Sequence, residues 1–267
     1  MKILISNDDG IGANGIRALA EALSEKHDVY VVAPDRERSA AGHSLTLHTP
    51  LRVDKLDDKT FKAKGVWSTT GTPGDCIKIA VSEILTADEQ PDLIISGINH
   101  GPNLGMDIIY SGTVSCAMEG AMLGFPSIAV SYAGMKWDYE NFKFASKFIV
   151  NLLDKKLNVE DFPPRTILNI NIPSVDEEDI AGIAITEMGG RVFTNDYEKR
   201  IDPRGKTYYW LAGELTTEPA DANTDISAVR NNKISITPVT YDMTHFAMLD
   251  ELEELLCLDG GCNWFQE

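Results

Sequence analysis

The sequence predicts an α/β protein built around a mainly parallel sheet. Short apolar runs rich in β-branched residues recur along the first two thirds of the chain, and segments with apolar residues at helical spacing lie between them. The first run, residues 2–6, is followed by a helical pattern over 16–23 and by a second run over 29–32. This βαβ opening favours parallel strands joined by a right-handed crossover.

Later segments continue the alternation of strands and helices. Apolar runs predict further strands over 91–97, 126–131 and 166–173. Helical patterns lie at about 72–85, 114–123 and 139–153, and the aromatic stripe of the last is interpreted as core packing. Thr72, Pro73 and Asp75 provide an N-cap, a first-turn proline and a first-turn acid for the helix at 72–85. Residues 50–70 predict short antiparallel strands beside the parallel core.

Charge and hydropathy restrict the classes of partner. The 267 residues carry 41 acidic and 24 basic side chains, a net charge of -17, which argues against binding to nucleic acid duplexes or to an anionic membrane surface. No apolar stretch approaches the ~20 residues of a membrane span, and no signal-sequence pattern precedes the first strand. The four cysteines suit a reducing compartment better than a disulfide scaffold. We therefore expect a cytoplasmic protein.

The first strand ends in a polar cluster, Asn7-Asp8-Asp9-Gly10. In open α/β sheets, ligands bind outside the carboxyl ends of the strands. Two adjacent carboxylates at such a place repel each other unless a cation neutralises them. Asp8 and Asp9 are therefore predicted to bind a metal ion. A surface turn is the alternative, since the same residue types also form turns.

The glycines around this cluster also match a dinucleotide-binding fingerprint. Gly10, Gly12 and Gly15 fit G-x-G-x-x-G, and Asp35 follows about 20 residues later. In that fingerprint, backbone amides at the end of the strand face a pyrophosphate, whereas two carboxylates stand at that place in this chain. We therefore interpret the glycines as residues that let the loop fold tightly around a metal and let a helix start close by.

Later segments place further polar side chains at the same edge of the sheet. The loop after the second strand contains Ser39, whose hydroxyl can complete a hard-cation shell; a solvated loop is the alternative. A long glycine-rich connection contains Asn99 and Asn103, which offer neutral oxygen donors. Ser111-Gly112-Thr113 opens a helix whose free amides and hydroxyls suit a phosphate, although Ser and Thr are also ordinary helix caps.

Beyond Pro173 the pattern changes to short β segments separated by polar loops. The β segments lie at 180–186, 207–211 and 234–237, the polar loops at 191–204 and 218–224, and short helical patterns at 225–230 and 246–258. We divide the chain into a core, 1–173, and an extended C-terminal region, 174–267. The arm formed by this region is expected to pack on a partner chain, because it has little core of its own.

Several short motifs occur in order along nearly the whole chain. They are Asn7-Asp8-Asp9-Gly10, Ala33-Pro34-Asp35-Arg36, Ser39 to Ser44, Gly71-Thr72-Pro73, Ser96 to Gly101 and Tyr110 to Val114, followed by Asn169 to Pro173, Thr224-Asp225 and Ile236-Thr237-Pro238. This set resembles the SurE family of survival-protein phosphatases, which are 5'/3'-nucleotidases.

The resemblance implies a Rossmann-like α/β catalytic core with a mainly parallel sheet, and an extended β-rich C-terminal arm that joins subunits into a homodimer or homotetramer. It implies a phosphatase that hydrolyses nucleoside monophosphates with one divalent metal ion, Mg²⁺ or Mn²⁺. Position by position, it implies that the metal ligands are Asp8, Asp9, Ser39 and Asn99. It also implies that Asn103, Ser111, Gly112 and Thr113 bind the phosphate.

The residue types agree with this chemistry. Two carboxylates, a hydroxyl and an amide are all oxygen donors, which Mg²⁺ and Mn²⁺ prefer. Such an ion polarises a phosphoryl group and activates a bound water, so we expect direct hydrolysis, with Asp8 or Asp9 as the proton acceptor. Two alternatives stay open. One is an aspartyl-phosphate intermediate, although the D-x-D spacing usual for that chemistry is missing, and the other is a nucleotide-sensing module without turnover.

Overall fold

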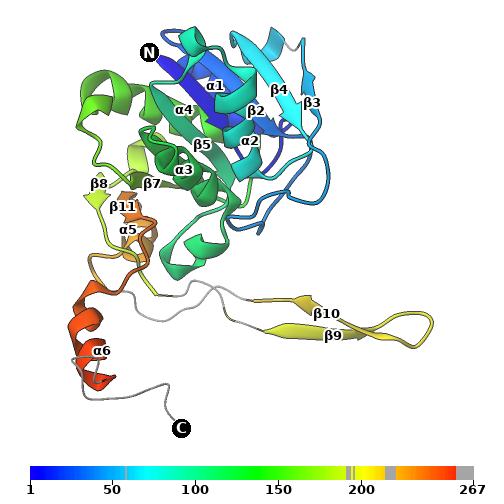
Figure 1. Ribbon diagram of the computed structural model, residues 1–267, viewed down its shortest axis with the longest axis vertical. Helices are drawn as coiled ribbons and strands as arrows, with labels where there is room; N and C mark the ends of the chain where they lie inside the picture. The colour runs from blue at the N-terminus through cyan, green and yellow to red at the C-terminus, as the bar shows by residue number, and fades with distance from the viewer. Residues whose placement is uncertain (58, 191–193, 195, 214–220, 257–267) are drawn as a thin grey trace, which may run out of the picture.

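The first predicted strand, β1 (Lys2–Ser6), lies in the middle of a nine-stranded sheet (Figure 1). The computed structural model describes residues 1–267 except 58, 191–193, 195, 214–220 and 257–267. The other strands of this sheet are β2 (Asp28–Pro34), β3 (Val53–Lys55), β4 (Gly65–Thr69), β5 (Leu93–His100), β6 (Ser127–Ala133), β7 (Thr166–Pro173), β8 (Ile183–Ile185) and β11 (Ile234–Thr240).

The strand order is β3-β4-β2-β1-β5-β6-β7-β11-β8. The six strands from β4 to β7 in this order are parallel to one another, whereas β3 is antiparallel to β4 and β11 is antiparallel to β7. The predicted α/β class with a mainly parallel sheet is confirmed. The prediction of antiparallel strands over residues 50–70 is wrong in one detail. Of the two strands in this segment that belong to the main sheet, β3 is antiparallel to its neighbour, whereas β4 is parallel to β2. Pairing partners of short strands depend on tertiary contacts that the local pattern does not contain.

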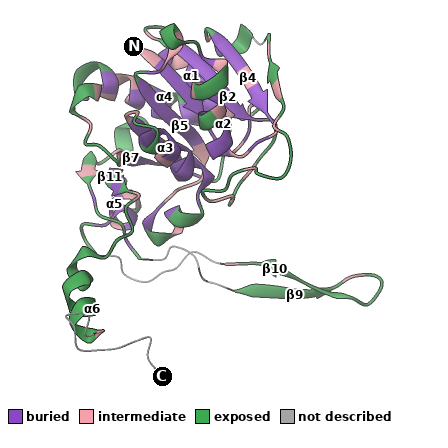
Figure 2. Ribbon diagram, viewed as in Figure 1, coloured by how far each residue is buried: buried purple, intermediate pink, exposed green. Residues whose placement is uncertain are grey.

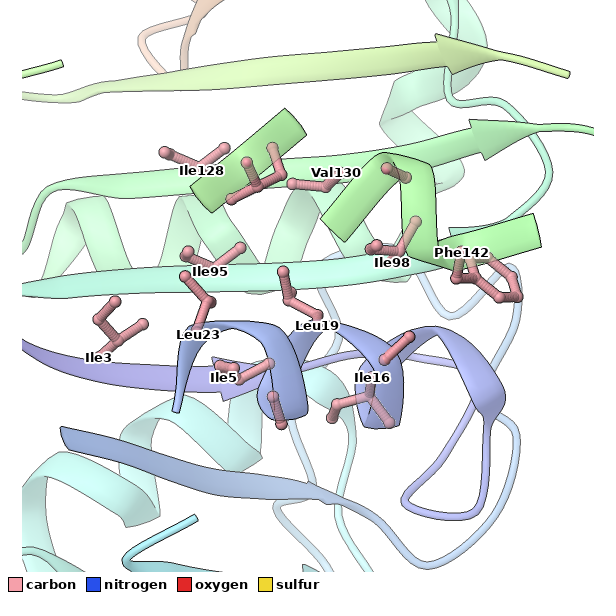
Figure 3. Packing of buried hydrophobic residues seen from close by; sticks show 14 of the residues in the cluster. Ile3, Ile5, Ile16, Leu19, Leu23, Ile95, Ile98, Ile128, Val130 and Phe142 are labelled. Carbon is pink, nitrogen blue, oxygen red and sulfur yellow. The ribbon is translucent and has the colours of Figure 1, made fainter. Parts of the chain in front are cut away.

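Helices cover both faces of the sheet. They are α1 (Asn14–Leu23), α2 (Pro73–Ile79), α3 (Gly112–Met122) and α4 (Tyr139–Lys155). Figure 3 shows the layer in which Ile16 and Leu19 of α1 pack near Ile5 of β1, and Phe142 of α4 belongs to the same cluster. Leu4 points to the opposite face and packs with residues of α2 and α3. Both faces of the central strands are thus buried, as the continuous apolar runs predict.

Two glycines in the first loop allow close approaches of the backbone. Gly10 has a φ of +93°, and a Cβ placed on it would lie 2.8 Å from the carbonyl carbon of Arg36. A Cβ on Gly15, in the first turn of α1, would overlap the carbonyl oxygen of Ile98 in β5. The loop is therefore tight, and α1 starts against β5, as the sequence interpretation of these glycines requires.

The start of α2 confirms the predicted cap. The Thr72 hydroxyl accepts a hydrogen bond from the Asp75 backbone amide, while the Asp75 carboxylate accepts one from the Thr72 amide at 2.9 Å. The same carboxylate accepts a hydrogen bond from the Thr46 amide at 3.1 Å, so it also ties down the loop before β3. The predicted helix continues beyond α2 as a π-helical turn, η2 (Ala80–Ile84).

Asp75→Ala is expected to lower the free energy of unfolding by about 1–2 kcal/mol at neutral pH, because it removes the acceptor for two partly buried backbone amides, those of Thr46 and Thr72. Burial acts to raise the pKa of the Asp75 carboxyl, but the hydrogen bonds from Thr46 and Thr72 outweigh it and lower the pKa below the usual value. Since the folded-state pKa is lowered, this stabilisation is present above the unfolded-state pKa and is lost as the pH falls through the folded-state pKa. Urea denaturation of both proteins at about pH 7 and about pH 3 should show the larger difference at the higher pH. An equal difference at both values would contradict the role given to the ionised carboxylate.

The C-terminal region contributes to the main sheet and also extends away from it. β11 and β8 complete one side of the sheet, and the short helix α5 (Asp225–Arg230) precedes β11. A separate hairpin is formed by β9 (Tyr197–Ile201) and β10 (Thr207–Leu211), which projects from the body of the molecule (Figure 1). The division of the chain at residue 173 stays a prediction.

The sequence interpretation of 191–204 as a polar loop is wrong where β9 forms. All five residues of β9 are exposed, and its sequence Tyr-Glu-Lys-Arg-Ile has no buried face, so the apolar alternation that marks a strand is absent. Figure 2 shows the hairpin and the last described helix, α6 (Leu249–Leu255), as exposed segments. The predicted helical pattern at 246–258 is present as α6 and a preceding 3₁₀ turn, and its last two residues lie outside the described residues.

Two expectations from composition concern cysteines and membranes. Cys76 and Cys116 are buried free thiols, while Cys257 and Cys262 lie outside the described residues. None of the helices in the described ranges combines the length and the apolar character that a membrane crossing requires.

Candidate active site

The candidate site lies where the strand order of the sheet reverses. β2 follows β1 on one side, and β5 pairs with β1 on the other side, with Ser6 opposite Ser96. Asp8 and Asp9 come just after β1, and Asn99 is the penultimate residue of β5. In doubly wound α/β folds this reversal opens a crevice at the carboxyl ends of the strands, where ligands bind. The topology therefore brings these three predicted residues to one crevice.

Asp8 lies against the first turn of α3. Its side chain is buried, with 4% of the residue exposed, and the Thr113 hydroxyl donates a hydrogen bond to its Oδ1. The same hydroxyl lies 3.1 Å from Asn99 Oδ1, so one hydroxyl links the ends of two strands. A Cβ on Gly112 would lie 2.7 Å from both the Cβ and Oδ2 of Asp8. Only a glycine leaves this space at the N-terminus of the helix.

Both carboxylate oxygens of Asp9 are held by His100. The His100 backbone amide donates to Oδ2 at 3.1 Å, and the ring Nδ1 lies 3.2 Å from Oδ1. The His100 ring in turn stacks on Trp137, with centroids 5.2 Å apart and planes 6° from parallel. His100 is not among the predicted site residues, although it stands next to Asn99 at the end of β5. Its contact with Asp9 orients that carboxylate.

The electrostatics of the two acids favour a bound cation. Burial raises the pKa of Asp8 despite the hydrogen bonds from Thr113. Burial and the charge of Asp8 together raise the pKa of Asp9 to about 7. Ionising both carboxylates in this place is unfavourable without a compensating positive charge. The buried Oδ1 of Asn7, which has no hydrogen-bond partner among the described residues, is a further orphaned acceptor in the same turn.

The oxygen donors present fit a hard divalent ion such as Mg²⁺ or Mn²⁺. Among the described residues, no group of three or more His, Cys, Asp and Glu side chains is placed to hold a metal. An ion placed between Asp8 and Asp9 would take its other protein ligands from backbone carbonyl, side-chain amide or hydroxyl oxygens. Asn99 Oδ1 is of this kind and shares the Thr113 hydroxyl with Asp8.

Ser39 lies in the neighbouring loop with its hydroxyl turned to another residue. Ser39 Oγ donates to Glu37 Oε1 at 2.7 Å, and the residue is exposed. The Arg38 amide donates to the Asp8 carbonyl at 2.7 Å, so the loop is fixed beside the acidic turn. Glu37, which the sequence did not indicate, adds a negative charge that acts to raise the pKa of both Asp8 and Asp9.

Asn103 is positioned by the polar face of β7. Its carbonyl accepts hydrogen bonds from the side-chain amides of Asn169 and Asn171 at 2.9 and 2.8 Å, and its backbone amide donates to Asn171 Oδ1 at 2.8 Å. Its own side-chain amide donates to Ser131 Oγ at 2.8 Å. The alternating asparagines of this strand therefore hold Asn103, a predicted phosphate-binding residue.

Ser111 acts as the N-cap of α3. Its hydroxyl accepts a hydrogen bond from the Val114 amide at 3.0 Å. The capping interpretation of this residue is thus confirmed, while phosphate binding by Ser111, Gly112 and Thr113 stays a prediction. The amides of the first turn of a helix lack intrahelical partners and favour anions, so the two roles are compatible.

Comparison with known proteins identifies the family. The family model described as "Survival protein SurE" matches residues 3–195 of the chain. The chain belongs to the SurE family. The "5'-nucleotidase SurE" of Heliobacterium modesticaldum is 48% identical over 267 residues, which cover 100% of this chain and 95% of that protein. The "5'-nucleotidase SurE" of Synechococcus elongatus is 47% identical over 262 residues, covering 96% and 99%.

A solved structure of the SurE family has the same fold. The crystal structure of the SurE protein from Aquifex aeolicus matches with a TM-score of 0.80 and 43% sequence identity, and the match covers 95% of this chain and 98% of that one. The resemblance to the SurE family and the Rossmann-like α/β fold that it implies are confirmed. The names of the relatives also agree with the nucleotidase class of enzyme expected from the motifs.

Proposed function

We propose that this SurE-family protein is a nucleotidase that hydrolyses nucleoside 5'-monophosphates to nucleoside and phosphate, and that it also accepts 3'-monophosphates. The observation that carries the proposal is the pair of buried adjacent carboxylates, Asp8 and Asp9, at the reversal of strand order and beside the N-terminus of α3. The relatives named 5'-nucleotidase SurE support the reaction.

One divalent ion, Mg²⁺ or Mn²⁺, is proposed to bind Asp8, Asp9 and Asn99. Ser39 joins this set when its hydroxyl leaves Glu37. When bound, such an ion supplies positive charge that polarises the phosphoryl oxygens and lowers the pKa of a coordinated water. The nearby amides of Gly112 and Thr113 and the Asn103 side chain are proposed to receive the phosphate oxygens, because the start of a helix favours an anion.

The geometry of the acids supports direct attack by water. A nucleophilic carboxylate needs an oxygen that is free to approach phosphorus. Asp8 Oδ1 is hydrogen-bonded to Thr113, and its Oδ2 lies against Gly112, while both oxygens of Asp9 contact His100. Asp8 and Asp9 are adjacent and are held by different partners, Thr113 and His100, whereas aspartyl-phosphate chemistry usually has D-x-D spacing, so we propose that one of them accepts a proton from the attacking water.

Phosphate release from AMP tests the proposed function. Release is expected with Mg²⁺ or Mn²⁺, is expected to stop with excess EDTA, and should return when the metal is restored. A nucleotide-sensing module would bind AMP without releasing phosphate. Isolation of a phosphorylated enzyme in the quenched reaction would contradict attack by water.

The hairpin is the proposed contact between subunits in a homodimer or homotetramer. According to the β9–β10 register, Tyr197, Ile201, Tyr209 and Leu211 share one face of it with Lys199 and Thr207, and the four apolar or aromatic side chains are all exposed. Exposed contiguous apolar side chains of this kind mark interaction surfaces. A deletion after Thr224 is a poor test of assembly, since it would also remove β11 from the main sheet.

Tyr209→Glu is expected to shift the protein toward smaller species in sedimentation, because it replaces an exposed aromatic contact opposite Lys199 by a carboxylate that a partner surface would have to bury. Glu198→Gln changes a residue on the opposite face of the hairpin and is the matched control. Its mass distribution should equal that of the wild type. An unchanged distribution for Tyr209→Glu would contradict assembly through this face.

A further inference from the structure

A cavity of ≈ 510 Å³ opens beside the predicted phosphate-binding turn. Its walls come from the loop after β2, from the 3₁₀ segment η4 (Gly105–Tyr110), and from the base of the hairpin. The lining includes Ala40, Asp107, Tyr110, Thr194, Tyr197 and Leu211. Its volume falls in the range of about 300–1,000 Å³ that small-molecule sites occupy.

Two walls of the cavity are continuous with the proposed metal and phosphate site. Ala40 follows Ser39 in the chain, and Tyr110 precedes Ser111, the N-cap of α3. The Gly42 amide donates to the Tyr110 carbonyl at 3.1 Å, which joins the loop to η4. A group attached to a phosphate at the start of α3 therefore has this cavity as its neighbour.

A buried aspartate joins the start of η4 to the segment before the hairpin. Asp225 accepts hydrogen bonds from the Gly105 amide at 2.7 Å and from the Gly189 amide at 2.9 Å. The Met106 amide also donates to the Gly190 carbonyl at 3.2 Å. Because Asp225 is fully buried, these contacts fix the two segments relative to each other, and one of them, η4, contributes Asp107 and Tyr110 to the cavity.

We propose that this cavity binds the nucleoside part of the substrate, with the base stacked against Tyr110. Tyr110 is 56% exposed, and Tyr197 and Leu211 add aromatic and apolar surface from the hairpin. A base has a π-face that stacks on such rings whatever its identity, so the site is suited to nucleotides as a class. The inference rests on the proposed nucleotidase function and extends it to the part of the substrate that does not react.

The test compares AMP with ribose 5-phosphate, which carries the same phosphate ester without a base. Tyr110→Ala is expected to lower kcat/KM for AMP about tenfold, equivalent to about 1.4 kcal/mol, and to leave the value for ribose 5-phosphate unchanged. Tyr110→Phe keeps the ring and should retain the wild-type value for AMP. Ile109→Ala removes a similarly exposed neighbour that does not line the cavity, and it should alter neither substrate.

Each outcome separates this inference from the proposed function. Equal loss for both substrates in Tyr110→Ala, or no loss for either, would overturn base binding by Tyr110 while leaving the nucleotidase intact. If the wild type hydrolyses neither substrate, the proposed function is wrong. Binding of adenosine then tests, without any turnover, whether the cavity binds a nucleoside. Calorimetry should then show adenosine binding to the wild type that weakens about tenfold in Tyr110→Ala and not in Ile109→Ala. Equal affinities in all three proteins would overturn the inference.

Discussion

Asp8→Asn is expected to lower kcat/KM for AMP by at least ~10³-fold, because a metal ion that stabilises transition-state charge contributes several kcal/mol and each 1.36 kcal/mol is tenfold in rate. The substitution keeps the shape of the side chain and an acceptor for the Thr113 hydroxyl, so the fold should persist. It removes one of the two carboxylates that a cation would neutralise.

Thermal unfolding gives a second readout that does not depend on turnover. Mn²⁺ should raise the Tm of the wild type, since a ligand that binds only the folded state stabilises it, and should have a much smaller effect on Asp8→Asn. Asp54→Asn, which changes an exposed residue at the sheet edge, is the matched control and should behave as the wild type in both assays. Wild-type turnover by Asp8→Asn would reject the role of Asp8 as a metal ligand.

Gly112→Ala is expected to lower kcat for AMP by ~10²-fold, because a displacement of about 1 Å at a catalytic group is sufficient for such a loss. The new methyl group would stand 2.7 Å from Asp8 Cβ and Oδ2, which is closer than real Cβ contacts. Either Asp8 or the first turn of α3 has to move, and the hydrogen bond between Thr113 and Asp8 is then lost. The free energy of unfolding should fall by about 1–3 kcal/mol as in other overpacked cores.

Gly12→Ala is the matched control for this substitution. Gly12 lies in the loop after the acidic turn, and no atom outside its chain neighbours lies within 4 Å of a Cβ placed there. Its activity and stability in urea denaturation should stay near those of the wild type. Equal effects of the two substitutions would show that the approach of Gly112 to Asp8 does not matter for the site.

The sequence could predict that the residues of the candidate site lie close together, because the topology of parallel strands determines where they meet. Asp8, Asp9 and Asn99 follow apolar runs, and the carboxyl ends of parallel strands meet at one edge of the sheet. A helix that starts close to the end of the first strand is likewise indicated by the glycines of the first loop, whereas its contact with Ile98 of β5 at Gly15 is not.

Side-chain partners could not be predicted in the same way. His100 donates a hydrogen bond to Asp9, 91 positions earlier in the chain, and Gly105 donates one to Asp225, 120 positions later. The hydroxyl of Ser39 is directed to Glu37, two residues away, because the loop conformation places those groups together. Such contacts depend on loop geometry and on the packing of distant segments, neither of which leaves a periodic pattern in the sequence.

The first strand of the hairpin, β9, could not be predicted for a different physical reason. A strand is recognised by the alternation that burial of one face produces, and β9 has no buried face within the described chain. β10 was indicated by its run Thr-Tyr-Tyr-Trp-Leu, yet this strand is exposed as well. An apolar strand that stays exposed within the described part of its own chain is consistent with the proposed contact between subunits.

Anomalous diffraction from a crystal soaked in Mn²⁺ tests most directly whether a divalent ion holds the two acids together. A single manganese peak is expected at about 2.0–2.3 Å from carboxylate oxygens of Asp8 and Asp9 and from Oδ1 of Asn99, at the N-terminal end of α3. Side chains of Asp8 and Asp9 that diverge toward solvent, with no manganese peak between them, would contradict the proposed metal site and the function that depends on it.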